Sequence, residues 1–271
     1  MLFDSHTHLN NETHTDGQRA ELAKEIEASE VSFVADVGFD LESSAIAVKH
    51  AEKYPWCYAV VGYHPHDAKG MDEMSFSMIR ALAKKPKVVA IGETGLDYYR
   101  NLSPKDVQRE VFRKQIRLAN ELKMPIVIHS READLEVMNI LKEEQAFSNE
   151  RKSWFPKRNG EPDARVLLHC YSGSAELAKQ YVKLGATISV AGPITYANAR
   201  KGIEMVDAIP IEYLLIETDA PYLTPEPFRG RRNKSPYVKY TAMKVAEIKG
   251  MTYKDVARIT CENAKRFYGI E

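Results

Sequence analysis

The stretch Leu2-Phe3-Asp4-Ser5-His6-Thr7-His8-Leu9 decides how this chain is interpreted. It is short and apolar at its start, which predicts a β-strand rather than a helix. Because strand side chains alternate between faces, Asp4, His6 and His8 point the same way. Two imidazoles on one face form half of a metal site, since histidine is the commonest metal ligand. Paired histidines also occur on plain strand surfaces, so the rest of the chain has to decide between these interpretations.

Seven further apolar runs follow, separated by longer amphipathic stretches that predict helices, for example over 106–122 and 175–184. The predicted strands are Leu2–His8, Val31–Val37, Cys57–Gly62, Val88–Gly92, Pro125–His129, Arg165–His169, Ala186–Val190 and Tyr213–Thr218. A strand followed by a helix, eight times over, is typical of an α/β chain folded as a (β/α)8 TIM barrel. A length of 271 residues suits one such barrel, so we expect residues 1–271 to form a single domain.

Reactive side chains gather where these strands end. Six of the eight histidines lie at or just past a predicted strand end, Glu93 follows the fourth strand, and Asp219 follows the eighth. The carboxyl ends of barrel strands converge on one face, where the active site of this fold lies. An open doubly wound sheet is the competing fold, but it would not bring these residues together at one site.

Composition limits the partners and the compartment. Lys plus Arg number 38 and Asp plus Glu number 38, so no overall charge attracts a polyanion and any nucleic-acid contact must be local. The three cysteines form no C-x-x-C pair, which argues against a disulfide framework. There is no signal-peptide pattern and no apolar run long enough to span a membrane. We expect a cytoplasmic protein without membrane contact, and nothing points to an obligate protein partner.

Four imidazoles and two carboxylates make up the candidate metal set: His6, His8, Glu93, His129, His169 and Asp219. This set is larger than the three protein ligands of a catalytic zinc, and it suits two divalent ions with Glu93 as the bridge. We expect Gly92 and Gly95 to let the backbone approach the ions. Asp219 would be a ligand and also the base for a metal-activated water. The ions could be zinc, nickel, magnesium or manganese.

Two further roles are predicted next to the metals. Asp4 is expected to stand behind the histidine pair and accept an imidazole N–H. His64, just past the third strand, could steer a scissile phosphate or protonate a leaving oxygen. Tyrosines at the barrel mouth, Tyr98, Tyr99 and Tyr222, could stack a terminal base or simply pack.

A basic loop follows the eighth strand and contains Arg229, Arg231 and Arg232. Loops after barrel strands seven and eight often bind phosphate, and arginine offers it two parallel donors. We therefore expect these three arginines to bind substrate phosphate, with a merely solvated basic loop as the alternative. The polar stretch 147–164 is expected to be a surface insertion on the opposite face, or else an interaction patch built around Trp154 and Phe155.

Several motifs resemble the TatD family of metal-dependent hydrolases. They are Asp4-Ser5-His6-Thr7-His8-Leu9, Gly62-Tyr63-His64-Pro65-His66, Gly92-Glu93-Thr94-Gly95-Leu96-Asp97, Pro125-Ile126-Val127-Ile128-His129-Ser130-Arg131, His169-Cys170-Tyr171-Ser172-Gly173, Glu217-Thr218-Asp219-Ala220-Pro221 and Arg229-Gly230-Arg231-Arg232-Asn233. The resemblance implies a distorted, amidohydrolase-like TIM barrel and a metal-dependent deoxyribonuclease, often a 3′ to 5′ exonuclease on DNA or RNA. It also implies that His6, His8, Glu93 and Asp219 bind one ion, and Glu93, His129 and His169 the second. Lys234-Ser235-Pro236 departs from the Glu-Pro often found in the family.

We therefore predict a two-metal phosphodiesterase acting on nucleic-acid ends. The same site could instead hydrolyse a carbonyl ester or amide, as a D-aminoacyl-tRNA deacylase or a lactonase would. A binding protein whose metals only stabilise the barrel is the remaining alternative. Open coordination positions argue against it, because structural zinc sites are usually closed by four protein ligands.

Overall fold

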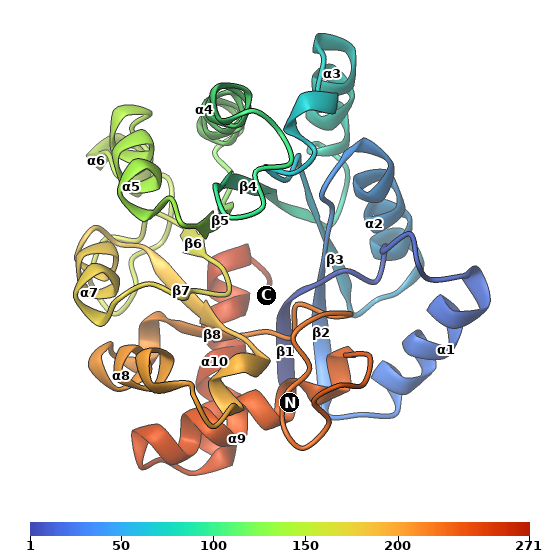
Figure 1. Ribbon diagram of the computed structural model, residues 1–271, viewed down its shortest axis with the longest axis vertical. Helices are drawn as coiled ribbons and strands as arrows, with labels where there is room; N and C mark the ends of the chain where they lie inside the picture. The colour runs from blue at the N-terminus through green and yellow to red at the C-terminus, as the bar shows by residue number, and fades with distance from the viewer.

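The computed structural model describes residues 1–271 and contains eight parallel strands that pair in chain order (Figure 1). The strands are β1 (Leu2–Thr7), β2 (Val31–Val37), β3 (Cys57–Val61), β4 (Val88–Asp97), β5 (Ile126–Arg131), β6 (Val166–Leu168), β7 (Thr187–Val190) and β8 (Leu214–Ile216). Every predicted strand is present, and helices separate them along the chain. The expected (β/α)8 barrel is confirmed.

The helices surround the strands, as Figure 1 shows. They are α1 (Asp16–Glu27), α2 (Leu41–Lys53), α3 (Glu73–Leu82), α4 (Lys105–Glu121), α5 (Asp134–Glu143), α6 (Asn149–Ser153), α7 (Ala175–Lys183), α8 (Arg200–Ala208), α9 (Val238–Lys249) and α10 (Tyr253–Tyr268). One apolar cluster of 50 buried residues fills the layer between strands and helices. A second cluster contains 12 buried residues. In it, strand residues such as Phe3 and Leu215 pack with Phe267 of α10, so this helix contributes to a part of the core separate from the first cluster. None of these helices is both long and apolar enough to cross a membrane.

The seam between β8 and β1 is closed without a regular strand ladder, which distorts the barrel. The Ser5 hydroxyl donates to the Ile216 carbonyl at 3.0 Å. Beyond it, the Asp219 N–H donates to the His6 carbonyl at 2.9 Å, and the His8 N–H to the Ala220 carbonyl at 2.8 Å. The residues that close the seam therefore include three members of the candidate metal set.

Strand β4 runs five residues beyond its predicted end, so Glu93 lies inside the strand rather than after it. Two glycines with positive φ make this possible: 151° at Gly92 and 143° at Gly95. A Cβ at Gly95 would stand 2.0 Å from the His129 carbonyl oxygen, and one at Gly92 2.8 Å from that of Val127. The glycines therefore let β5 approach β4 closely, which differs from the predicted approach of backbone to ions.

The stretch 147–164 lies at the end of the barrel opposite the candidate site, as predicted, and it is anchored by buried arginines that the prediction of a surface insertion did not include. Arg151, in α6, is 1% exposed, and its guanidinium donates to the carbonyls of Ala164 and Met124 at 2.9 and 2.8 Å. Arg158 is equally buried and pairs with Asp163 at 2.9 Å. Met124 and Ala164 precede β5 and β6, so the stretch covers the amino ends of these strands. Its two buried arginines hold the fold together and are not available for an exposed basic patch.

Candidate metal centre

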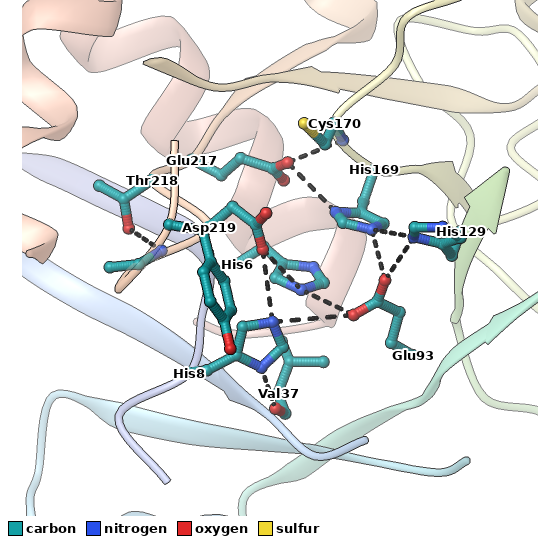
Figure 2. Close-up of polar contacts among 12 residues, drawn as sticks. His6, His8, Val37, Glu93, His129, His169, Cys170, Glu217, Thr218 and Asp219 are labelled. Atoms are coloured by element: carbon teal, nitrogen blue, oxygen red, sulfur yellow. Dashed lines mark hydrogen bonds and ion pairs between the residues drawn. The ribbon is translucent and has the colours of Figure 1, made fainter. Parts of the chain in front are cut away.

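The carboxyl ends of five strands bring the six predicted residues together (Figure 2). His6 is in β1 with His8 directly after it, Glu93 is in β4, His129 in β5, His169 directly after β6, and Asp219 three residues after β8. Parallel strands of one barrel all end on the same face, which is why residues more than 200 positions apart in sequence meet here.

Glu93 is the centre of the cluster and is 3% exposed. Its Oε1 lies 2.9 Å from Nδ1 of His129 and 2.6 Å from Nε2 of His169, and these two nitrogens are 3.4 Å apart. Its Oε2 lies 3.2 Å from Nε2 of His6 and 3.8 Å from Nε2 of His8. One carboxylate is therefore shared between two pairs of imidazoles, one pair on each oxygen.

Asp219 completes the pair formed by His6 and His8. Its Oδ1 lies 3.3 Å from Nε2 of His8 and 3.8 Å from Nε2 of His6, and its side chain is 16% exposed. The residue has a φ of 53°, a left-handed conformation that costs a non-glycine residue about 1–3 kcal/mol. This turn after β8 directs the carboxylate at the histidines, so backbone strain accompanies the placement of a candidate ligand.

These residues fit divalent cations. Every ion-pair partner of Glu93 and Asp219 is a histidine, so no lysine or arginine neutralises the two carboxylates. Both ring nitrogens of His6 are buried without a hydrogen-bond partner, which is costly unless another group binds them. Burial works against ionisation of Glu93, yet the charge of His169 and the hydrogen bonds from His129 and His169 hold its pKa well below the usual range. An anionic carboxylate among imidazoles is a donor set that suits zinc or another transition metal.

His64 also faces Glu93, with Nε2 3.4 Å from Oε1. Its Nδ1 accepts a hydrogen bond from the His66 backbone N–H at 3.0 Å. A neutral ring that accepts at Nδ1 carries its proton on Nε2, so His64 directs a donor into the site rather than a lone pair. Burial lowers its pKa to about 4, which keeps the ring neutral. His64 is therefore a less suitable ligand than His169, although both approach the same oxygen.

Two carboxylates outside the predicted metal set lie behind the imidazoles. Oδ2 of Asp97 is 3.2 Å from Nε2 of His129 and 2.7 Å from Nε2 of His66. Oε1 of Glu217 accepts from the Cys170 N–H at 2.7 Å and faces Nδ1 of His169 at 3.3 Å. Such partners fix the orientation of metal-binding histidines. For Asp97 a sequence signal existed, because it is four residues past Glu93 and strand alternation predicts one face for both, whereas Glu217 lies past the end of β8, where alternation does not apply.

The predicted contact between Asp4 and an imidazole N–H is not made, and this prediction is wrong. The carboxylate instead accepts from the Thr218 N–H at 2.8 Å and from its hydroxyl at 2.6 Å. Asp4 is fully buried at the β1–β8 seam, and burial raises its pKa to about 7. Its influence on the site passes through Thr218, which precedes Asp219 in the chain.

The three arginines of the basic loop are exposed and contact loop residues rather than the metal set: Arg229 and Arg232 reach other loops, and Arg231 stays within its own. The Arg229 guanidinium lies 4.1 Å from the centre of the Tyr196 ring, and that of Arg231 lies 5.6 Å from the Phe228 ring. Arg232 donates to the Thr13 hydroxyl. Tyr196 follows β7 and Thr13 follows β1, so the loop lies at the same end of the barrel as the candidate metal centre.

Comparison with known proteins agrees with this arrangement. A family model described as TatD related DNase matches residues 3–269. Over 270 residues, the full length of both chains, the sequence is 46% identical to the uncharacterized metal-dependent hydrolase YabD of Bacillus subtilis (strain 168). It is 35% identical over 251 residues, 90% of each chain, to the 3′-5′ ssDNA/RNA exonuclease TatD of Citrobacter koseri. The crystal structure of YJJV, a TatD homolog from Escherichia coli K12, has the same fold, with a TM-score of 0.87 at 24% identity over 100% of this chain and 98% of that one. The chain therefore belongs to the TatD-related DNase family and is an enzyme of the metal-dependent hydrolase type.

Proposed function

We propose that this enzyme hydrolyses phosphodiester bonds at the 3′ end of single-stranded DNA, and of RNA as well, with two divalent metal ions. The observation that carries the proposal is the division of Glu93 between two pairs of imidazoles. A shared carboxylate of this kind suits two neighbouring ions, an arrangement common in phosphatases and nucleases. The substrate and the polarity are supported by the name of the relative from Citrobacter koseri, a 3′-5′ ssDNA/RNA exonuclease.

The two oxygens of Glu93 face different histidines, and we assign the ligands of the two ions accordingly. His6, His8, Glu93 and Asp219 would hold one ion, and Glu93, His129 and His169 the other. When bound, two such ions lower the pKa of a water and offset the negative charge that develops on a phosphate.

The chain itself supplies the remaining roles. Asp219 is the candidate base. Its carboxylate is more exposed than that of Glu93 and can accept a proton from a water at the mouth of the barrel. His64 is the candidate donor to a phosphate oxygen, because its Nε2 carries the proton and points into the site. Arg229, Arg231 and Arg232 would bind phosphates of the strand that lies over the loop.

The direct test is digestion of a single-stranded DNA oligonucleotide labelled at its 5′ end, with metal-loaded protein and with EDTA. Stepwise shortening of the labelled strand supports a 3′ exonuclease, whereas immediate release of a labelled mononucleotide overturns that polarity. Asp219→Asn and His129→Ala must abolish the activity, since activity that survives in them belongs to a contaminating nuclease. Hydrolysis of a D-aminoacyl-tRNA ester without digestion of DNA or RNA would replace the proposal with the carbonyl-ester activity.

Arg229→Ala checks the substrate side separately. It should weaken binding of the oligonucleotide, measured by fluorescence anisotropy, while the metal content of the protein stays unchanged. Loss of metal would mean that the loop supports the metal centre and does not bind phosphate.

A further inference from the structure

The mouth of the barrel has three tyrosines, and the structure distinguishes them. Tyr98 is engaged elsewhere, because its hydroxyl donates to Glu136 at 2.7 Å and its ring packs on the core. Tyr99 is 58% exposed, but the Arg131 guanidinium lies 4.1 Å from its ring centre and covers one face. Tyr222 is 54% exposed and is the one whose ring contacts a residue of the candidate metal centre.

Tyr222 is held at both ends. Its N–H donates to the Asp219 carbonyl at 3.0 Å, and its carbonyl accepts from the Asn233 amide at 2.6 Å. At the far end of the ring, the hydroxyl accepts from Nδ2 of Asn11 at 3.1 Å. Asn11 is itself buried and fixed, because its Oδ1 accepts from the N–H and the hydroxyl of Thr13. The ring is therefore prevented from folding down onto the protein, and an aromatic surface stays in solvent.

The ring stands beside the metal ligands. Its centre lies 6.4 Å from the centre of the His8 ring, with 64° between the two planes. Nε2 of His8 in turn faces Asp219 at 3.3 Å. A planar group stacked on Tyr222 would therefore lie next to the ion site formed by His8 and Asp219, within the reach of one sugar from a phosphate bound there.

We propose that Tyr222 is the stacking platform for a base next to the phosphodiester that is cleaved, an inference that rests on the proposed nuclease function. Stacking on an aromatic ring does not depend on which base is present, because each base has a π face. It also requires that face to be free, which favours a frayed or single-stranded end over paired bases inside a duplex.

The surroundings of Tyr222 extend the site toward the backbone of the strand. Thr13, which fixes Asn11, also accepts a hydrogen bond from Arg232. Tyr222 and the Arg232 guanidinium are thus linked through two intervening side chains. A base on the ring would bring an adjoining phosphate toward an exposed cation, in the pattern of aromatic and basic groups that binds single strands.

The test compares natural and abasic substrates on matched variants. One oligonucleotide carries natural bases, and two others carry a stable abasic residue at the last or the second-last 3′ position. The ratio of kcat/KM, natural over abasic, measures how much the enzyme gains from the missing base. In the wild-type enzyme we expect this ratio to lie between about 5 and about 150 at one of the two positions, the range of one base–aromatic stack. In Tyr222→Ala it should fall toward 1, mainly through KM.

Three variants keep the result interpretable. Tyr222→Phe retains the ring and should retain the ratio, and Tyr222→Trp should retain or increase it. Tyr253→Ala removes another tyrosine, which bonds Glu30 at the opposite end of the barrel, and should leave the ratio at the wild-type value. Metal content and melting temperature of each variant show whether a change reflects a damaged site.

The outcomes separate the two proposals. A ratio as large in Tyr222→Ala as in the wild type overturns the stacking role. A wild-type enzyme that cleaves natural and abasic ends equally well also overturns it, while the nuclease function stands. A metal-loaded wild-type enzyme that cleaves none of the oligonucleotides overturns the nuclease function itself.

Discussion

Oδ2 of Asp97 lies 3.2 Å from Nε2 of His129, on the edge of the imidazole opposite to Glu93. This contact holds the ring proton on Nε2 and leaves the Nδ1 lone pair facing Glu93. Asp97 thus acts on the candidate metal centre through His129 and not as a ligand, which makes it a positioning residue.

Asp97→Asn should weaken metal binding about 10- to 100-fold, the usual cost of losing such a partner, because an amide oxygen accepts the imidazole proton less strongly. Isothermal titration of the metal-free protein with Mn²⁺ or Zn²⁺ measures the change. Asp134→Asn is the matched control, since Asp134 accepts from Ser130, next to His129, and touches no imidazole. Equal affinities in the two variants would show that Asp97 does not orient His129.

Gly95→Ala should damage the site by steric pressure alone. The new methyl group would meet the His129 carbonyl at 2.0 Å, and φ at this position is 143°. We expect a loss of about 1–3 kcal/mol in the free energy of unfolding, as in other overpacked sites, together with weaker metal binding. Urea unfolding and metal titration measure both effects. Gly70→Ala has no atom within 4 Å of the added methyl and should match the wild type.

Metal removal should lower the melting temperature. A ligand that binds only the folded state stabilises it by about 2.7 kcal/mol at a hundred times its Kd. Thermal melts with EDTA and with added Mn²⁺ or Zn²⁺ give the difference. Glu93→Gln should lose most of the metal-induced shift, because both Glu93 oxygens face imidazoles, whereas His169→Ala should keep a part of it. No shift in the wild type would contradict the assignment of this cluster as a metal centre.

Arg151→Met should destabilise the fold without changing the chemistry. The guanidinium donates to three backbone carbonyls and to the Asn120 side chain, and leaving buried groups unpaired costs about 1–3 kcal/mol each. We expect a fall of several kcal/mol in the free energy of unfolding, with unchanged activity per folded molecule. Lys157→Met, at an exposed lysine of the same stretch, should change neither quantity. A large loss of activity in folded Arg151→Met would show that this end of the barrel is coupled to the site.

Much of the fold was predictable from the sequence, because a regular alternation of strand and helix patterns allows few topologies. The convergence of His6, Glu93 and Asp219 was predictable for the same reason, since parallel barrel strands share a carboxyl end. The length of β4 was not predictable from propensity, because glycines usually weaken strands, and here their missing side chains let β5 approach.

The hydrogen-bond partners of individual polar groups could not be predicted from the sequence either. Alternation predicts one strand face for Asp4, His6 and His8, yet the Asp4 carboxylate bonds Thr218, because the seam brings the segment just past β8 within hydrogen-bond distance of it. Glu217 and Asp97 acquire their roles from contacts across strands, which depend on register and tilt. The burial of Arg151 depends on carbonyls that the barrel leaves open at its amino end.

The seam between β8 and β1 has a consequence for how the enzyme matures. The bonds that close the barrel, from Asp219 to His6 and from His8 to Ala220, join the end of the first strand to the segment just past the last strand. A growing polypeptide therefore exposes His6 and His8 long before Asp219 has been synthesised. Contacts of such large sequence separation form late, since the whole intervening chain must be ordered first. We expect chains halted before β8 to have no complete ion site, so catalytic competence would arise in one step, with ring closure.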